Sequence, residues 1–277
     1  RLKSAREEIA TTSLLPKPLG ITCFPLLHTA SHSALLVSLA ASRYHGASLL
    51  PANVYWPVDR MKTRAIINLA AIAHNLSVVR TLAPDSNIMA IVKADAYGHG
   101  VASLLPALEK HAQALAIARI EEAQILRTAG YTGRILLLAG VSDETELSTA
   151  ILLQLDILVH DHAHLPLLSS YTYQADHKTT LWLKMDTGMH RLGFAPQDYA
   201  NAFHTIKKLA WCKNIIGMTH FSSADETNKQ KTAQQIACYQ QHTADIALDN
   251  HSLANSAGII AWPAARCGWL RPGLMMY

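Results

Sequence analysis

Asn87-Ile88-Met89-Ala90-Ile91-Val92, followed at once by Lys93-Ala94-Asp95-Ala96-Tyr97-Gly98-His99-Gly100, is the stretch that decides the fold. Its first part is an apolar run without polar alternation, which is typical of a parallel strand covered by helices on both faces. We expect this strand over 87–96. A lysine at the end of such a strand is costly unless its amine is paired or works in the neutral form, as Schiff-base chemistry requires. For an isolated lysine, a strand-end side chain that simply reaches water is more common.

Seven more apolar runs of strand length follow, and helix-prone segments lie between them. We expect these strands over 114–119, 134–140, 156–160, 180–188, 214–221, 252–258 and 269–276. We expect helices over 69–83, 119–129, 143–155, 197–210 and 231–248. This alternation predicts an α/β fold, a closed (β/α)8 TIM-type barrel, with an open doubly wound sheet as the alternative. The helix at 69–83 precedes the first strand and can fill the eighth helical position.

Composition excludes several classes of protein. Of 277 residues, 50% are hydrophobic and 16% are charged, so the chain can bury a large core. The formal charge is only +4, and no run of Lys and Arg forms a patch for nucleic acid. No stretch of about 18 apolar residues predicts a membrane-spanning helix. The four cysteines form no C-x-x-C pair, which indicates reduced thiols in a cytoplasmic protein.

Residues 1–60 differ from the rest of the chain. They begin with Arg rather than Met and contain scattered Ser, His and Pro with few acidic residues. A signal-peptide core over 21–47 is an alternative, but His28, Ser31, His32 and Ser33 interrupt it. We expect an N-terminal extension over 1–60 without a fold of its own, upstream of a true start at Met61. The barrel domain is then expected over 61–277.

Three blocks together resemble the alanine racemase family. The block 92–100 resembles the family's attachment site for pyridoxal 5′-phosphate (PLP), although Asp95 stands where the family usually has Asn. The block 184–193 matches K-x-D-T-G-M-x-R-L-G, and 271–273 matches R-P-G. The resemblance runs in collinear order from Met61 to Tyr277 and covers the family's amino-terminal barrel domain.

The resemblance implies a role for each matching residue near the reacting atoms. Lys93 holds PLP covalently and moves the α-proton on one face of the substrate. Arg191 binds the substrate carboxylate, for which its forked donors are well suited. Lys184 matches a position that is carbamylated in many members and then orients Arg191; unmodified, it could instead pair with Asp186. His220 is expected to orient neighbouring groups rather than to act as acid or base.

The remaining matches concern the phosphate and the ring of the cofactor. Asn255 and Ser256 precede a helix, where Ser is usually only a cap but where free N–H groups also suit a phosphate. The resemblance implies that Ser256, the Tyr97 hydroxyl and the backbone N–H groups of Gly273 and Leu274 bind this phosphate. Arg271 is implied to lie against the pyridine nitrogen, where its charge disfavours protonation. Related barrel decarboxylases have a carboxylate there, so Arg271 argues against that reaction.

The expected function is therefore PLP-dependent interconversion of L-alanine and D-alanine, which supplies D-alanine for peptidoglycan. A non-catalytic PLP-binding barrel is the alternative, although it would have no need of Arg191. The family forms homodimers, and its second base is a tyrosine of a carboxyl-terminal β-domain acting in the partner subunit. The chain ends before such a domain, so we expect weak activity or none. His160, His162 and His164 form a conceivable metal cluster, but nothing nearby completes it, and no metal is expected.

Overall fold

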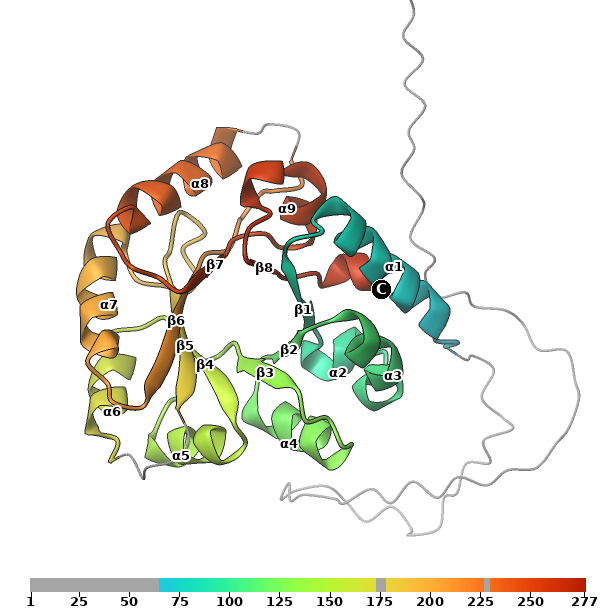
Figure 1. The fold of residues 1–277 in the computed structure, drawn as a ribbon, viewed down its shortest axis with the longest axis horizontal. Coiled ribbons are helices and arrows are strands. Elements are labelled where there is room, and N and C mark those ends of the chain that lie inside the picture. Colours follow the sequence, from blue (N-terminus) through green and yellow to red (C-terminus); the bar gives the residue numbers. More distant parts are fainter. Residues whose placement is uncertain (1–64, 173–177, 227–229) are drawn as a thin grey trace, which may run out of the picture. The chain divides into compact units, whose positions relative to one another are not determined.

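A computed structural model describes residues 65–172, 178–226 and 230–277 (Figure 1). Eight parallel strands form one sheet in the order β7-β6-β5-β4-β3-β2-β1-β8, so that the first strand lies beside the last. The strands are β1 (Asn87–Ile91), β2 (Ala114–Ile117), β3 (Arg134–Leu137), β4 (Leu155–Val159), β5 (Thr179–Lys184), β6 (Cys212–Met218), β7 (Asn250–Ser252) and β8 (Trp269–Leu270). The predicted (β/α)8 barrel is confirmed.

Helices surround the strands on the outside, as Figure 1 shows. They are α1 (Leu69–Leu82), α2 (Lys93–Gly98), α3 (Val101–His111), α4 (Ile120–Thr128), α5 (Glu144–Leu152), α6 (His164–Ser170), α7 (Tyr199–Lys207), α8 (Gln230–Thr243) and α9 (Ser256–Ala261). Helix α1 packs against α3 and α9. It therefore occupies the eighth position of the ring, as the sequence predicted.

The ring of strands is joined differently between β7 and β8 than elsewhere. Among the described residues, no ladder joins these two strands; a single parallel bridge links Asn255 and Arg271 instead. The Ser252 hydroxyl donates to the Trp269 carbonyl oxygen at 2.7 Å. The Arg271 amide donates to the Ala254 carbonyl oxygen at 3.0 Å. A side-chain hydrogen bond and a backbone hydrogen bond therefore connect β7 and β8 in place of a ladder.

Alternate residues of each strand point into the barrel and form its core. The largest set of mutually packed buried side chains includes Met89, Ile91, Leu136, Leu158, Trp182, Ile216, Met218 and Trp269. Because the side-chain period of a strand is two, Lys184 and Arg271 face inward two residues beyond the core tryptophans. The same alternation directs these two cations to the carboxyl ends of β5 and β8, where barrel enzymes carry their sites.

Several expected strands differ from the structure. The strand expected over 269–276 ends at Leu270, and a 3₁₀ turn follows at Leu274–Met276. The strand expected over 87–96 ends at Ile91, because a short helical segment begins at Lys93. The strand expected over 252–258 is wrong for most of its length. There, the Asn255 side chain accepts the amide of Gly258 at 3.0 Å and caps α9. The helices α2, α3 and α6 were not predicted as elements, whereas the helix expected after Asn255 is present as α9.

Two further expectations concern the ends of the chain and membranes. The extension over 1–60 and the boundary at Met61 lie outside the described residues. Within the described ranges, none of the helices has both the length and the apolar character to cross a membrane.

Candidate active site

A cavity of about 1000 Å³ lies at the carboxyl ends of the strands. Its walls include most of the side chains that the sequence singled out. These are Lys93, Tyr97, Lys184, Arg191, His220, Asn255, Ser256, Arg271, Gly273 and Leu274. Of the predicted site residues, only Asp186 is not part of this wall; it shapes the loop that carries Arg191.

Lys93 and Tyr97 are presented by a segment of unusual handedness. Ala94, Asp95, Ala96 and Tyr97 all have φ between +52° and +55°, which is the left-handed helical region. The Glu122 carboxylate of α4 accepts the amide of Ala94, and the Asp95 carboxylate accepts the amide of Val101 at 2.7 Å. The turn brings the Lys93 ammonium nitrogen within 5.9 Å of the Tyr97 ring centroid. The left-handed turn thus directs both side chains to one wall of the cavity.

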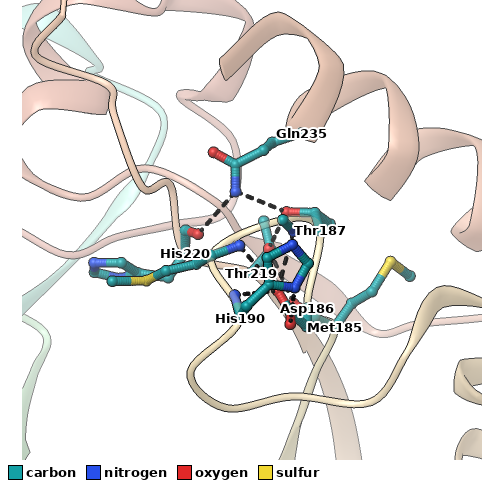
Figure 2. Close-up of polar contacts among 9 residues, drawn as sticks. Met185, Asp186, Thr187, His190, Thr219, His220 and Gln235 are labelled. Atoms are coloured by element: carbon teal, nitrogen blue, oxygen red, sulfur yellow. Dashed lines mark hydrogen bonds and ion pairs between the residues drawn. The ribbon is translucent and has the colours of Figure 1, made fainter. Parts of the chain in front are cut away.

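Arg191 lies on a loop that leaves the end of β5 and returns to it. The Asp186 carboxylate accepts the amides of Gly188, Met189 and His190, each at 3.0 Å (Figure 2). Although burial alone would raise the pKa of Asp186, these hydrogen bonds hold it below its usual value. The loop closes where the amide of Phe194 donates to the Lys184 carbonyl oxygen at 2.9 Å.

Gly193 permits this closure. Its φ of +128° is unfavourable for other residues, and a Cβ there would come within 2.6 Å of the Asp186 amide nitrogen. A side chain at this position would therefore push apart the two strands of the loop that carries Arg191.

Lys184 is buried in a positively charged part of the cavity. Burial lowers its pKa to about 8, and the charges of Arg191 and Arg271 add to this effect. The alternative in which Lys184 pairs with Asp186 is not realised, since no ion pair joins these two described residues. The lowered pKa gives Lys184 a larger neutral fraction near neutral pH than an ordinary lysine has, and carbamylation requires the neutral amine.

Arg271 and His220 form the floor of the cavity. The Arg271 guanidinium is fully surrounded and donates to the carbonyl oxygens of Thr219 (2.6 Å), Ser252 (2.7 Å) and Leu253 (3.1 Å). Burial lowers the pKa of His220 to about 3, and the positive charge of Arg271 is the largest electrostatic contribution. His220 is therefore neutral at physiological pH, which suits an orienting group rather than an acid.

Backbone donors converge on Ser256 at another wall of the cavity. Its hydroxyl oxygen accepts the amides of Gly273 at 2.9 Å and Met275 at 3.3 Å. Leu274 lines the cavity mouth, and its side chain is largely exposed. A Cβ on Gly273 would lie 3.1 Å from the Tyr97 hydroxyl oxygen, so the glycine leaves room between these groups.

Two residues next to the site were not found from the sequence. Glu122 holds Ala94 and also accepts the amides of Ala118 and Arg119. Gln235 donates to the Thr187 hydroxyl and to the His220 carbonyl oxygen (Figure 2). The available signal for Gln235 was its place on the apolar face of α8, one helical turn before Tyr239.

The histidine cluster that follows β4 does not assemble a metal site. His160 and His164 contact each other edge to face, with ring centroids 4.5 Å apart. His162 instead faces the Asp198 carboxylate at 3.5 Å. Throughout the described ranges, no group of three histidine, cysteine or acidic side chains is arranged to hold a metal ion.

Comparisons with known proteins identify the family of this barrel. The family model described as "Alanine racemase, N-terminal domain" matches residues 67–277. An alanine racemase of Halorhodospira halophila is 39% identical over 215 residues, covering 77% of this chain and 58% of that protein. One from Aeromonas hydrophila is 43% identical over 217 residues, covering 77% and 59%. The chain thus spans somewhat over half the length of these relatives.

Solved structures lead to the same family. The biosynthetic alanine racemase of Pseudomonas aeruginosa superposes with a TM-score of 0.72 at 36% identity, covering 76% of this chain and 57% of that one. An alanine racemase of Acinetobacter baumannii gives a TM-score of 0.69 at 30% identity.

Proposed function

The chain belongs to the alanine racemase family, and from this premise we propose that its barrel binds PLP and takes part in the interconversion of L-alanine and D-alanine. In its family this reaction supplies D-alanine for peptidoglycan. One observation carries the proposal. A single cavity brings together the amine of Lys93, the guanidinium of Arg191 and the convergent backbone donors of Gly273 and Met275.

The residues present fit PLP at both of its ends. At the phosphate end, two amides already share one oxygen, that of Ser256, in the manner in which amides share an anion's oxygen. The Tyr97 hydroxyl faces the same space across Gly273. At the aldehyde end, Lys93 supplies a primary amine. When bound, PLP withdraws electrons from the substrate's α-carbon and makes its proton removable.

Each cationic side chain then has a distinct task. Arg191 binds the carboxylate of alanine with two parallel donors and so orients the α-carbon toward Lys93. The Lys93 amine takes or returns the α-proton at its Nζ atom on one face. Lys184 orients Arg191, and its lowered pKa is consistent with carbamylation of its amine.

Arg271 and His220 determine the electrostatic environment of the cofactor ring. Three carbonyl oxygens fix the Arg271 guanidinium in place, and within the part of the chain that the structure describes no carboxylate forms an ion pair with it. We place the ring nitrogen against this charge, where it would remain unprotonated. This environment favours the racemase over the related barrel decarboxylases, which have a carboxylate at this position.

The proposal extends to the rest of the protein. The barrel domain is proposed to begin near Met61, and residues 1–60 to be dispensable for it. The active form is proposed to be a homodimer, in which a tyrosine of the partner subunit serves the other face of the substrate. The free cysteines, among them Cys212, Cys238 and Cys267, support a cytoplasmic location.

Chemical trapping tests the attachment of the cofactor. The protein is incubated with PLP, reduced with borohydride and digested, and the peptides are mapped by mass spectrometry. We expect the pyridoxyl mass on the peptide that contains Lys93. Lys93→Arg should abolish the label, whereas Lys184→Arg, which changes the other cavity lysine, should retain it. A label on Lys184 in the unchanged protein would contradict the proposal.

A further inference from the structure

Gln235 of α8 is a buried amide whose hydrogen-bonding capacity is fully used. Its Oε1 atom accepts the amide of Ser222 at 3.1 Å and the hydroxyl of the same residue at 3.3 Å. Its Nε2 atom donates to the Thr187 hydroxyl at 3.3 Å and to the His220 carbonyl oxygen at 3.2 Å (Figure 2). A side-chain amide has two acceptor sites and two N–H protons, and these four hydrogen bonds use all of them.

The backbone fixes which way round the amide lies. The Ser222 amide can only donate, so it requires Oε1, and the His220 carbonyl oxygen can only accept, so it requires Nε2. Rotating the amide by 180° would break both bonds at once. The orientation is therefore determined by partners that cannot change their own role.

From Gln235, a directed chain of hydrogen bonds leads to the end of β5. The Thr219 hydroxyl uses its proton on the Met185 carbonyl oxygen at 3.0 Å. It must therefore accept in its 2.7 Å contact with the Thr187 hydroxyl. Thr187 in turn has its oxygen free to accept from Gln235. Each hydroxyl therefore donates in one direction only, and the chain of hydrogen bonds ends at the Met185 carbonyl oxygen, directly after β5.

The loop held in this way is the one that presents Arg191. Thr187 lies between Gly188 and Asp186, whose carboxylate accepts the amides of residues 188–190. A Cβ on Gly188 would be 3.8 Å from the Cγ atom of Gln235, so the glutamine also packs beneath the loop. The other contact of Gln235 is the backbone of His220, whose ring lines the cavity.

We propose that Gln235 is a positioning residue that fixes the Arg191 loop relative to His220, and thereby determines how firmly the site binds a substrate carboxylate. The inference rests on the proposed function, since it takes Arg191 to be the carboxylate ligand. Gln235 is not among the described residues that line the cavity; it acts through Thr187 and the His220 backbone.

The test compares Gln235→Met with Gln234→Met in the full chain loaded with PLP. Methionine keeps the length of the side chain and removes all four hydrogen bonds, and Gln234 is an exposed neighbour on the same helix. Hydrogen exchange, followed by mass spectrometry, should speed up in Gln235→Met over 186–193 and 219–223, and not in β2. Propionate, which has the carboxylate but no amine, should bind at least about tenfold more weakly. Gln234→Met should match the unchanged protein in both measurements.

A second pair of variants guards against misfolding of Gln235→Met. Thr187→Val removes the hydroxyl from the loop side and should reproduce both effects, and Thr187→Ser restores the hydroxyl and should reverse them. Unchanged exchange over 186–193 in Gln235→Met or Thr187→Val would overturn the proposal. So would faster exchange with unaltered propionate binding. Failure of the unchanged protein to bind propionate would count against the proposed function instead, because the exchange data decide separately whether Gln235 holds the loop.

Discussion

Asp156 is an acidic side chain inside the barrel, away from the cavity. Its carboxylate accepts the Trp182 indole N–H at 2.8 Å and faces the Arg134 guanidinium at 3.5 Å. Burial raises its pKa from 3.8 to about 6, and Arg134, Trp182 and Lys213 offset only part of this effect. Between these two values the folded protein holds a proton that the unfolded chain has released. The free energy of unfolding that this bound proton adds is therefore fully present below about pH 4 and is lost as the pH rises through about 6.

Asp156→Asn should remove this pH dependence, because asparagine still accepts from Trp182 and does not titrate. Relative to Asp156→Asn, the unfolding free energy of the unchanged protein should fall by up to about 3 kcal/mol between pH 4 and 7. Urea unfolding followed by tryptophan fluorescence at several pH values measures the difference. The exposed Asp245→Asn serves as the control, and a parallel pH profile for Asp156→Asn and the unchanged protein would refute the assignment.

The sequence predicted the residues of the cavity better than the residues that hold them. Lys93, Lys184 and Arg271 could be found because each is a charged residue at the end of an apolar strand and belongs to a family block. Gln235 could not, since its importance depends on where α8 lies against the ends of β5 and β6. Local sequence carries no trace of a contact between residues 48 positions apart.

At the scale of elements, strands were predictable and their ends were not. Each of the eight expected runs overlaps an observed strand, because burial on both faces requires a strand to be continuously apolar, but the run over 252–258 shares only Ser252 with β7. The segment after β1 was expected to remain extended but forms a left-handed turn. Alanine and tyrosine do not favour this conformation, so tertiary contacts such as those of Glu122 impose it.

Ala94 offers a test of the strain in this turn. At φ 52° the Cβ of Ala94 destabilises the folded turn by about 1–2 kcal/mol, and glycine would remove this cost. About half of that stabilisation is offset, because glycine has more conformational freedom in the unfolded chain. We expect Ala94→Gly to raise the unfolding free energy by about 0.5–1 kcal/mol. The same change at exposed Ala102, in the right-handed helix α3, should lower it by about 1 kcal/mol. Denaturant unfolding compares the two, and equal signs would show that the turn is not strained.

At the scale of the whole molecule, the chain corresponds to a little over half of its relatives. Within that part the resemblance assigns one proton-moving group, Lys93. We expect the chain loaded with PLP to exchange the α-proton of one enantiomer of alanine in deuterated water faster than it inverts alanine, since Lys93 serves one face of the α-carbon and each acid–base group typically contributes about 10²- to 10⁴-fold. Proton NMR follows exchange, and a chiral assay follows inversion. Full-rate interconversion would show that the chain supplies its own second base.

A ribosome synthesises this barrel from β1 toward β8. The ring of strands can close only when β8 is available to lie between β7 and β1. β1 meets β2 soon after synthesis, but its other edge pairs with Trp269 and Leu270 at the far end of the domain. Arg271, which ties together the carbonyl groups of Thr219, Ser252 and Leu253, also arrives last. A nascent chain halted just before Trp269 therefore carries seven strands and a bare edge on β1, the kind of edge that recruits strands of other molecules. Aggregation during translation, and the demand for chaperones, should therefore persist until β8 has emerged from the ribosome and paired with β1.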